Sequence, residues 1–384
     1  MKISNKNVYV VHEWFVNYAG SEKVVEQFLN VFPESTLCAL IEFLPESLKW
    51  FIKNKKVNTS FLQIIPGIAK HYRNFLPLMP LAVRSLDVSK ADIIISSSHA
   101  VSKGVKTRKD QLHVCYCHTP MRYAWDLTEE YLKNSKLEKG LKGKLIKFIL
   151  ERIRRWDLKS ADNVTFFIAN SNYVAARIKN IYKRDAAVIY PPVATHEFEL
   201  REDKEDFYVA VSRMVSYKKI DLVVEAFTNM PGKKLYVIGT GPDLRKIQSK
   251  AGKNVVLLGH QPLGVLKDYM QRAKAFVFAA DEDFGITTVE AQACGTPVIA
   301  YRKGGSLETV REGRTGIYFD EQTVESITKA VMRFEEIKGQ FDPKLIRDHA
   351  ETFNEERFRN EILSFVEEKY SEFKSPQKAD AVVA

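Results

Sequence analysis

Short apolar runs alternate with helical patterns along the whole chain. Residues 7–14 form a largely apolar run, whereas residues 21–32 carry apolar side chains at three- and four-residue spacing. The first pattern predicts a buried strand. The second predicts an amphipathic helix with Ser21 as its N-cap. Further strands are predicted over residues 91–98, 112–118, 164–171, 186–192, 207–213, 234–241, 254–260, 275–280 and 296–301. Apolar strands separated by helices indicate parallel sheets with both faces covered.

The strand and helix alternation starts afresh near residue 207. Before it, Pro191, Pro192 and a charged run resist regular structure. A chain of 384 residues is also long for one core. We therefore expect an α/β protein with two doubly wound, Rossmann-like domains that face each other across a cleft, because ligands of such sheets bind beyond the carboxyl ends of the strands. The predicted segments are domains over 1–190 and 191–352, a helix over 353–374 that packs back on the first domain, and a disordered tail over 375–384.

The composition is that of a soluble globular protein, with 45% hydrophobic and 28% charged residues. No apolar run reaches the roughly 18 residues of a membrane span, and the first residues lack a signal-peptide pattern. These features predict a cytoplasmic protein. The four cysteines have no spacing typical of a disulfide framework or a zinc site, so we expect reduced thiols at Cys38, Cys115, Cys117 and Cys294.

The net charge of +10 is concentrated in the first half of the chain. Residues 1–200 carry 30 Lys and Arg against 19 Asp and Glu, whereas residues 201–384 carry 28 against 29. A basic first domain predicts an anionic partner. No nucleic-acid-binding motif accompanies the charge, so we expect a membrane surface and no nucleic acid.

The strongest basic run lies at residues 133–159, with ten Lys and Arg against three acids. Apolar residues recur there at helical spacing: Leu141, Leu145, Phe148, Ile149, Ile153 and Trp156. A basic amphipathic helix can lie on an anionic leaflet, where each cation adds about 1 kcal/mol. A solvated helix that packs on its own sheet has the same pattern. Residues 61–81 are apolar and interrupted by proline. For this segment the two alternatives are a groove for a lipid acceptor and packing inside the protein.

Candidate chemistry follows the predicted strands of the second half. Arg213 and Lys218 flank the loop after the strand at 207–213, and two fixed cations suit a diphosphate. Surface salt bridges are the alternative. Gly239 and Gly241, after the next strand, permit close approach of backbone to a ligand, which alone is a weak signal.

The segment DEDFGITTVEAQACGTP, residues 281–297, combines two glutamates with a Phe-Gly pair. Glu282 follows the strand at 275–280, and a helix is predicted to begin near Gly285. The free N–H groups of residues 285–288 suit phosphate or sugar oxygens, and Glu290, about one turn in, suits vicinal hydroxyls. Acids that stabilise a helix dipole are the alternative. A dedicated metal site needs further carboxylates, so no metal and no cofactor are expected.

On these motifs the second half resembles retaining glycosyltransferases of family 4, which have the GT-B architecture. The matching stretches are SRMVSYKK, VIGTGPD, LLGH, the Glu282–Glu290 block, EAQACGTPVIA and GGSLETVREGRTGIYF. The resemblance implies that the second domain binds a nucleotide-sugar and the first an acceptor. Arg213 and Lys218 are then expected at the diphosphate, Glu290 at the ribose, and Glu282 at the sugar. The other donor-binding residues implied are Gly239, Gly241, Gly259, His260, Phe284, Gly285, Ile286 and Thr287.

The first half narrows the resemblance. HEWFVNYAGSEKVVE and CYCHTPMRYAWDL are similar to bacterial mannosyltransferases that build O-antigen or exopolysaccharide on a lipid carrier. The resemblance implies that His118 contacts the sugar and that Gly20 faces the donor phosphate. A lone histidine is otherwise a satisfied core residue. The acceptor-side candidates implied are Arg122, Tyr123, Trp125 and Asp126.

The resemblance thus implies a retaining transfer of a hexose, mannose from GDP-mannose, to a lipid-linked or glycan acceptor in lipopolysaccharide or exopolysaccharide synthesis. Fixed cations and helix amides stabilise the leaving diphosphate, and no metal is required. The expected location is the inner face of the plasma membrane. The alternatives are a UDP-sugar donor, a nucleotide-sugar epimerase of the same fold, and a non-catalytic nucleotide-sugar-binding scaffold.

Overall fold

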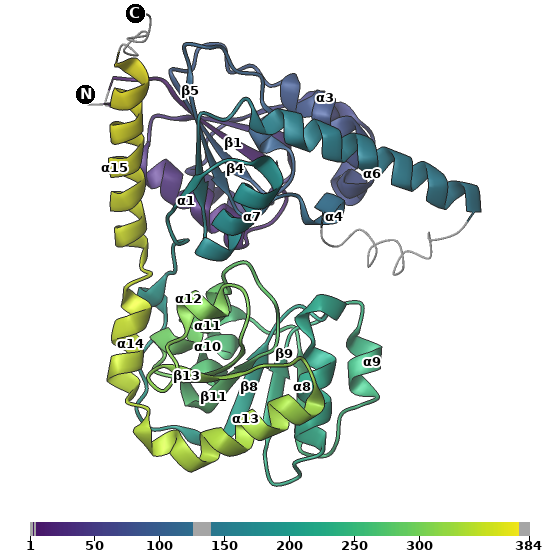
Figure 1. Cartoon of the computed structure of the whole chain (residues 1–384), viewed down its shortest axis with the longest axis vertical. Helices are drawn as coiled ribbons and strands as arrows, with labels where there is room; N and C mark the ends of the chain where they lie inside the picture. The colour runs from purple at the N-terminus through teal and green to yellow at the C-terminus, as the bar shows by residue number, and fades with distance from the viewer. Residues whose placement is uncertain (1–2, 4, 126–139, 376–384) are drawn as a thin grey trace, which may run out of the picture. The chain divides into compact units, whose positions relative to one another are not determined.

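The computed structural model describes residues 3, 5–125 and 140–375. The chain divides into two compact units, the first made of Met1–Tyr190 with Phe358–Ala384 and the second of Pro191–Arg357. Each unit contains one parallel sheet with helices packed against it (Figure 1). The prediction of two Rossmann-like α/β domains is confirmed.

The first unit has a seven-stranded sheet in the order β3-β2-β1-β4-β5-β6-β7. Each strand pairs in parallel with its neighbours, and the order reverses between β1 and β4. Such a reversal is the switch point where doubly wound sheets bind ligands. The strands are β1 (Val8–Phe15), β2 (Thr36–Glu42), β3 (Val57–Thr59), β4 (Ile93–Ser98), β5 (Leu112–Cys117), β6 (Phe166–Ala169) and β7 (Ala186–Val188).

Helices cover both faces of this sheet, because alternate strand residues point to opposite sides. Val10 and Ile95 share a core with α1 (Gly20–Val31) and α15 (Glu355–Lys374), and the rings of Phe28 and Phe358 stack there at 5.9 Å. The other face packs against α3, α6 and α7, which Figure 1 labels. The remaining helices of this unit are α2 (Ile68–His71), α3 (Met79–Arg84), α4 (Arg122–Trp125), α6 (Gly140–Ala161) and α7 (Asn172–Tyr182).

The second unit has a six-stranded sheet in the order β10-β9-β8-β11-β12-β13. All of its neighbouring strands are parallel, and its order reverses between β8 and β11. The second switch point therefore lies between these two strands. The strands are β8 (Glu205–Val211), β9 (Leu235–Ile238), β10 (Val255–Gly259), β11 (Ala273–Phe278), β12 (Val298–Tyr301) and β13 (Gly316–Phe319).

Two layers of helices enclose the second sheet as well. Val223 of α8 and Val331 of α13 are fully buried against one face. On the other face Tyr269 of α10 packs edge-on against Phe207, with ring centroids 6.0 Å apart. The helices are α8 (Ile220–Thr228), α9 (Leu244–Gln248), α10 (Leu263–Arg272), α11 (Ile286–Ala293), α12 (Ser306–Thr309), α13 (Val324–Ile337) and α14 (Pro343–Glu351).

Every strand segment predicted from the sequence contains a strand of the structure, but the prediction missed β2, β3 and β13. β3 has three residues, and β13 follows a turn-rich stretch that hides its pattern. The assignment of Ser21 as N-cap was wrong. The helix already begins at Gly20, and Glu22 Oε2 binds the N–H of Ala19 at 3.2 Å.

The four cysteines are buried and free. Burial raises the pKa of the Cys38 and Cys294 thiols to about 12, so these side chains are protonated core residues. Among the helices of the described residues, none combines the length and apolarity needed to cross a bilayer.

Candidate functional site

The loops at the carboxyl edge of the second sheet carry the predicted donor-binding residues. Arg213 and Lys218 lie in the loop after β8, and Gly239 and Gly241 lie in the loop after β9. Glu282 lies in the loop after β11. Because all strands of this sheet are parallel, these loops lie at one edge, where such sheets bind ligands.

The glycines of this edge fit closely against neighbouring backbone. Gly239 has φ 135° and donates its N–H to the carbonyl of Gly259 at 2.7 Å. A Cβ at Gly239 would overlap the carbonyl oxygen of Ser212, and one at Gly241 would overlap that of Met214. The close approach that these glycines permit is therefore to the Arg213 loop itself, and it holds that loop in place.

The side chains of Lys218 and Glu282 form an ion pair. They come from the loops after β8 and β11, so the pair spans the switch point of the second sheet. The two side chains are 19% and 18% exposed, which leaves both within reach of a ligand. Arg213, in contrast, is exposed and has no ion pair among the described residues.

The loop after β12 supports Glu282 and was missed by the sequence analysis. The N–H of Gly305 donates to the carbonyl of Glu282 at 2.8 Å, and Lys303 pairs with Asp281 at 2.9 Å. Any Cβ at Gly305 would overlap the backbone of Phe284. The Gly304–Gly305 pair in the sequence was the signal that could have located this contact.

Helix α11 begins beside this loop, with Gly285 at φ 86°. Glu290 is 8% exposed, and Phe284 is buried with its ring centroid 5.6 Å from that of Phe353. Of the four N–H groups that were expected to be free, that of Thr288 is paired, because it donates to the carbonyl of Gly285. Ile286 and Thr287 are half-buried at the helix start, which leaves a smaller anion site than predicted.

The base-loop candidates lie at the end of β10. Gly259 has φ 69°, and its carbonyl accepts the N–H of Gly239. His260 is exposed. Gly259 is therefore hydrogen-bonded to the loop after β9, and the His260 side chain lies at the surface.

In the first unit, His118 lies directly after β5 and is half-buried. Its Nε2 lies 2.8 Å from the hydroxyl of Ser97, which lies 3.1 Å from Nδ1 of His12. Burial, together with the neighbouring His99 and His12 rings, holds the pKa of His118 well below its usual value. Gly20, at the start of α1, follows β1, so Gly20 and His118 both lie at the carboxyl edge of the first sheet.

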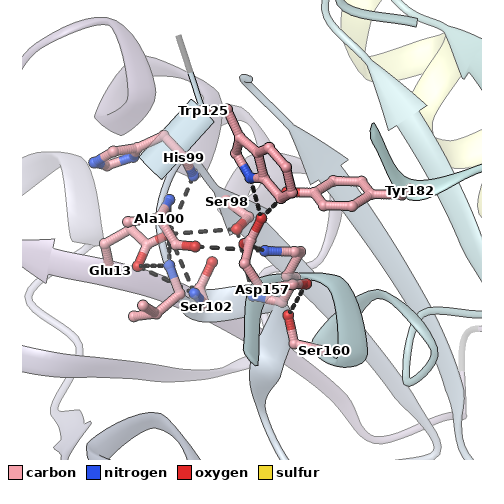
Figure 2. Close-up of polar contacts among 11 residues, drawn as sticks. Glu13, Ser98, His99, Ala100, Ser102, Trp125, Asp157, Ser160 and Tyr182 are labelled. Atoms are coloured by element: carbon pink, nitrogen blue, oxygen red, sulfur yellow. Dashed lines mark hydrogen bonds and ion pairs between the residues drawn. The ribbon is translucent and has the colours of Figure 1, made fainter. Parts of the chain in front are cut away.

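Glu13 forms a second polar cluster at this switch point. Its fully buried carboxylate accepts the backbone N–H groups of His99, Ala100, Val101 and Ser102 (Figure 2). Burial alone would raise the pKa of Glu13, but the neighbouring His99 and these N–H groups outweigh it and lower the pKa. Glu13 therefore acts as a buried anion that holds the loop after β4.

Asp157 of α6 holds one of the acceptor-side candidates, Trp125. It is fully buried, forms an ion pair with Lys103, and accepts the indole N–H of Trp125 at 2.8 Å and the hydroxyl of Tyr182 at 2.9 Å (Figure 2). Trp125, predicted to stack on a sugar, is thus tied to the core through its nitrogen. Arg122 is half-buried at the start of α4. The side chain of Tyr123 and all of Asp126 lie outside the described residues.

The basic segment forms α6, and its apolar residues divide into two groups. Ile153 is buried and Ile149 and Trp156 pack against the core with it, whereas Leu145 and Phe148 are 58% and 57% exposed. Lys144, Lys147, Arg152 and Arg155 are exposed on the same helix. Internal packing therefore accounts for Ile149, Ile153 and Trp156, whereas Leu145 and Phe148 lie at the surface beside exposed cations.

No group of three or more His, Cys, Asp or Glu side chains is placed to hold a metal ion in the part of the chain that the structure describes.

The chain is similar to known proteins in sequence and in fold. Residues 194–351 match the model of the family described as glycosyl transferases group 1, which covers most of the second unit. The sucrose-phosphate synthase of Thermosynechococcus elongatus has a similar structure, with a TM-score of 0.72 over 96% of this chain and 100% of that one, at 16% identity. Residues 194–351 thus form a domain of the glycosyl transferases group 1 type, and the chain has the two-domain fold of that synthase.

Two curated relatives are similar in sequence. The chain is 31% identical over 202 residues to the GDP-mannose-dependent alpha-(1-6)-phosphatidylinositol monomannoside mannosyltransferase of Mycolicibacterium smegmatis, which covers 44% of this chain and 52% of the relative. It is 25% identical over 285 residues to the D-inositol 3-phosphate glycosyltransferase of Mycobacteroides abscessus, covering 70% and 64% respectively. The chain thus spans between about half and two thirds of the length of these relatives.

Proposed function

We propose that the protein is a retaining glycosyltransferase that moves a hexose, mannose from GDP-mannose, onto a lipid-linked or glycan acceptor in the synthesis of a bacterial surface polysaccharide. The observation that carries the proposal is the Lys218–Glu282 pair at the second switch point, beside the exposed cation of Arg213. A nucleoside diphosphate brings two negative groups to such a site, and the hydroxyls of a hexose can donate hydrogen bonds to a carboxylate.

The chemistry follows from the charges at this edge. Departure of a nucleoside diphosphate builds negative charge in the transition state. Arg213, Lys218 and the start of α11 stabilise that charge, and Glu282 orients the sugar through its hydroxyls. In this scheme side chains and backbone, not a metal ion, balance the charge of the leaving group. Activity that persists in excess EDTA is therefore expected.

The donor and the acceptor are the finer parts of the proposal. The Mycolicibacterium smegmatis relative is named as GDP-mannose-dependent and as acting on a phosphatidylinositol mannoside, which supports mannose and a lipid-linked acceptor. The exposed Leu145 and Phe148 and the four exposed cations of α6 support attachment to an anionic membrane surface.

The first test is a thermal-shift panel with GDP-mannose and matched UDP- and ADP-sugars. A ligand that binds only the folded state raises its melting temperature, by an amount that grows with the ligand concentration relative to Kd. GDP-mannose should give the largest shift. Analysis of products with donor alone, and then with a lipid-linked mannoside, separates transfer from epimerisation and from binding without turnover. A larger shift with a UDP-sugar overturns the choice of donor.

Substitution of Lys218 tests the charge argument. Lys218→Ala should lower kcat by about 10²–10³-fold, the usual loss when one group that stabilises a developing anion is removed. Lys246→Ala is the matched control, because Lys246 is a 59% exposed lysine of the same unit that pairs with Asp221. Turnover rates at saturating donor measure the effect. Wild-type turnover by Lys218→Ala contradicts the proposed role.

A further inference from the structure

A line of polar side chains runs from the start of α1 to His118 within the first unit. Glu22 Oε1 lies 3.5 Å from His12 Nε2, and the opposite nitrogen, Nδ1, lies 3.1 Å from Ser97 Oγ. That hydroxyl lies 2.8 Å from Nε2 of His118. Glu22, His12 and Ser97 are at most 2% exposed. Nε2 of His12 makes no hydrogen bond among the described residues, so its contact with Glu22 is electrostatic, whereas both contacts of Ser97 are within hydrogen-bond distance.

The first member of the line is an ionised carboxylate. Oε2 of Glu22 accepts the N–H of Ala19 at 3.2 Å and the hydroxyl of Ser21 at 3.0 Å. Burial opposes ionisation, but the contact with His12 and the hydrogen bonds of the carboxylate outweigh it and lower the pKa of Glu22. A carboxylate only accepts, so it favours a proton on Nε2 of His12, and with the ring in that Nε2–H form Nδ1 is an acceptor.

The remaining protons follow from this assignment. The hydroxyl of Ser97 donates to Nδ1 of His12, and its oxygen then accepts the Nε2–H of His118. Nδ1 of His118 keeps its lone pair, and it makes no hydrogen bond among the described residues. The other titratable ring beside the line is His99, whose centroid is 6.2 Å from that of His118 and 6.3 Å from that of His12, and which helps to lower the pKa of Glu13.

A neighbouring serine–histidine pair shows that the group at the other ring nitrogen decides which partner donates the serine–histidine hydrogen bond. Ser96 Oγ lies 2.9 Å from Nε2 of His113, but Nδ1 of His113 lies 2.9 Å from the carbonyl oxygen of Asn163. A carbonyl only accepts, so His113 carries its proton on Nδ1 and accepts from Ser96. The two histidines therefore have opposite tautomers, although both contact a serine of β4.

We propose that Glu22, His12 and Ser97 are positioning residues that fix His118 in its Nε2–H tautomer and so make Nδ1 an acceptor for a hydroxyl group of the sugar. The identity of that hydroxyl rests on the proposed function. The line also ties His118 to the turn at Ala19–Ser21, which Glu22 holds and which contains Gly20.

Nitrogen-15 NMR of the histidine-labelled, ligand-free protein tests the tautomer directly. The chain has eight histidines, and a His118→Gln sample assigns the signals of His118. The wild type should show His118 as Nε2–H alone. His12→Phe keeps the ring beside Phe15, whose centroid lies 5.0 Å away, but frees the Ser97 hydroxyl to donate to His118. His118 should then become a mixture of tautomers. Ser97→Ala, which only removes an atom, should also give a mixture.

The matched control is Ser96→Ala, which removes a similar buried hydroxyl on the same strand. It should change the signals of His113 and leave both His118 and kcat/KM unchanged. His12→Phe and Ser97→Ala should lower kcat/KM by about tenfold, as loss of an outer-shell partner commonly does. An Nδ1–H tautomer in the wild type, or one unchanged tautomer in both variants, overturns the proposal. The expected tautomers in a protein that transfers no sugar would instead overturn the proposed function.

Discussion

Single residues at the two switch points are constrained by their neighbours before any ligand is considered. Gly241 is glycine because the Met214 carbonyl occupies the space of a Cβ, and Glu13 is ionised because four consecutive N–H groups face it. Sequence reasoning assigned Gly241 to a ligand and did not single out Glu13. In both cases the deciding partner lies in the loop after another strand, so no local pattern could have shown it.

Gly241→Ala tests this constraint. The new Cβ forces the loop after β9 away from the Arg213 loop, so donor affinity should fall by about tenfold or more, equivalent to at least about 1.4 kcal/mol. Gly264→Ala is the control, since a Cβ there meets no atom within 4 Å and alanine favours the helix α10. Titration of donor by calorimetry measures both. Equal affinities in the two variants would contradict the packing argument.

The Glu13 carboxylate makes the stability of the first unit depend on pH. Its pKa is lower in the folded state than the ordinary 4.5, so its contribution is present above pH 4.5 and is lost as the pH falls below it. Glu13→Gln should cost about 3 kcal/mol at pH 7, the upper range for hydrogen bonds to a charged group. The difference from wild type should shrink below pH 4.5.

Urea unfolding followed by tryptophan fluorescence measures this effect in the first unit, because Trp14, Trp50, Trp125 and Trp156 all lie there. Glu46→Gln is the control, as that side chain is 86% exposed. A pH-independent difference between Glu13→Gln and wild type would show that the carboxylate is not ionised.

At the scale of elements, the apolar pattern predicted most strands but did not show which apolar helix residues are buried. The spacing of Leu145, Phe148 and Ile153 predicted one apolar stripe on α6, yet only Ile153 is buried. A helix longer than the surface it covers leaves part of its stripe uncovered, and the sequence pattern is the same on both parts. The packing of α6 on the sheet decides which residues of its apolar stripe are buried and which are exposed.

The exposed part of α6 should bind membrane. A Leu145→Ser, Phe148→Ser double variant should bind vesicles of phosphatidylglycerol and phosphatidylcholine at least about tenfold more weakly, because burying one such side chain contributes about 1.5–3 kcal/mol. Its unfolding midpoint should stay unchanged. Leu345→Ser, 64% exposed on α14 of the second unit, is the control. Co-sedimentation at low salt measures binding, and wild-type binding by the double variant would exclude this surface.

At the scale of the whole molecule, helix α15 follows the second unit in sequence but packs in the core of the first unit. Phe358, Ile362, Val366 and Tyr370 of α15 are at most 2% exposed within the core that contains Val10 and Val24. Residues that follow the second unit in sequence thus pack in the core of the first unit, so the first unit requires them for its full stability.

Phe358→Ala should lower the free energy of unfolding of the first unit by about 3–5 kcal/mol, the usual cost of removing a buried phenylalanine. Leu363→Ala, on the same helix but 38% exposed, should change it by about 0.5 kcal/mol or less. Tryptophan fluorescence isolates the first unit, and circular dichroism records both. Equal effects of the two substitutions would mean that Phe358 adds little to this core.

The sequence by itself determined the α/β class, the two domains, most strands and the motifs at the second sheet, because these depend on periodicity and on residue types at fixed local spacing. Only the tertiary structure decided that Lys218 pairs with Glu282, that Lys303 and Gly305 support the site, and that His12, Glu22 and Ser97 lead to His118. Each of these contacts joins different strands or loops. Parallel pairing sets which strand ends become neighbours, and that information is not local to any stretch of the chain.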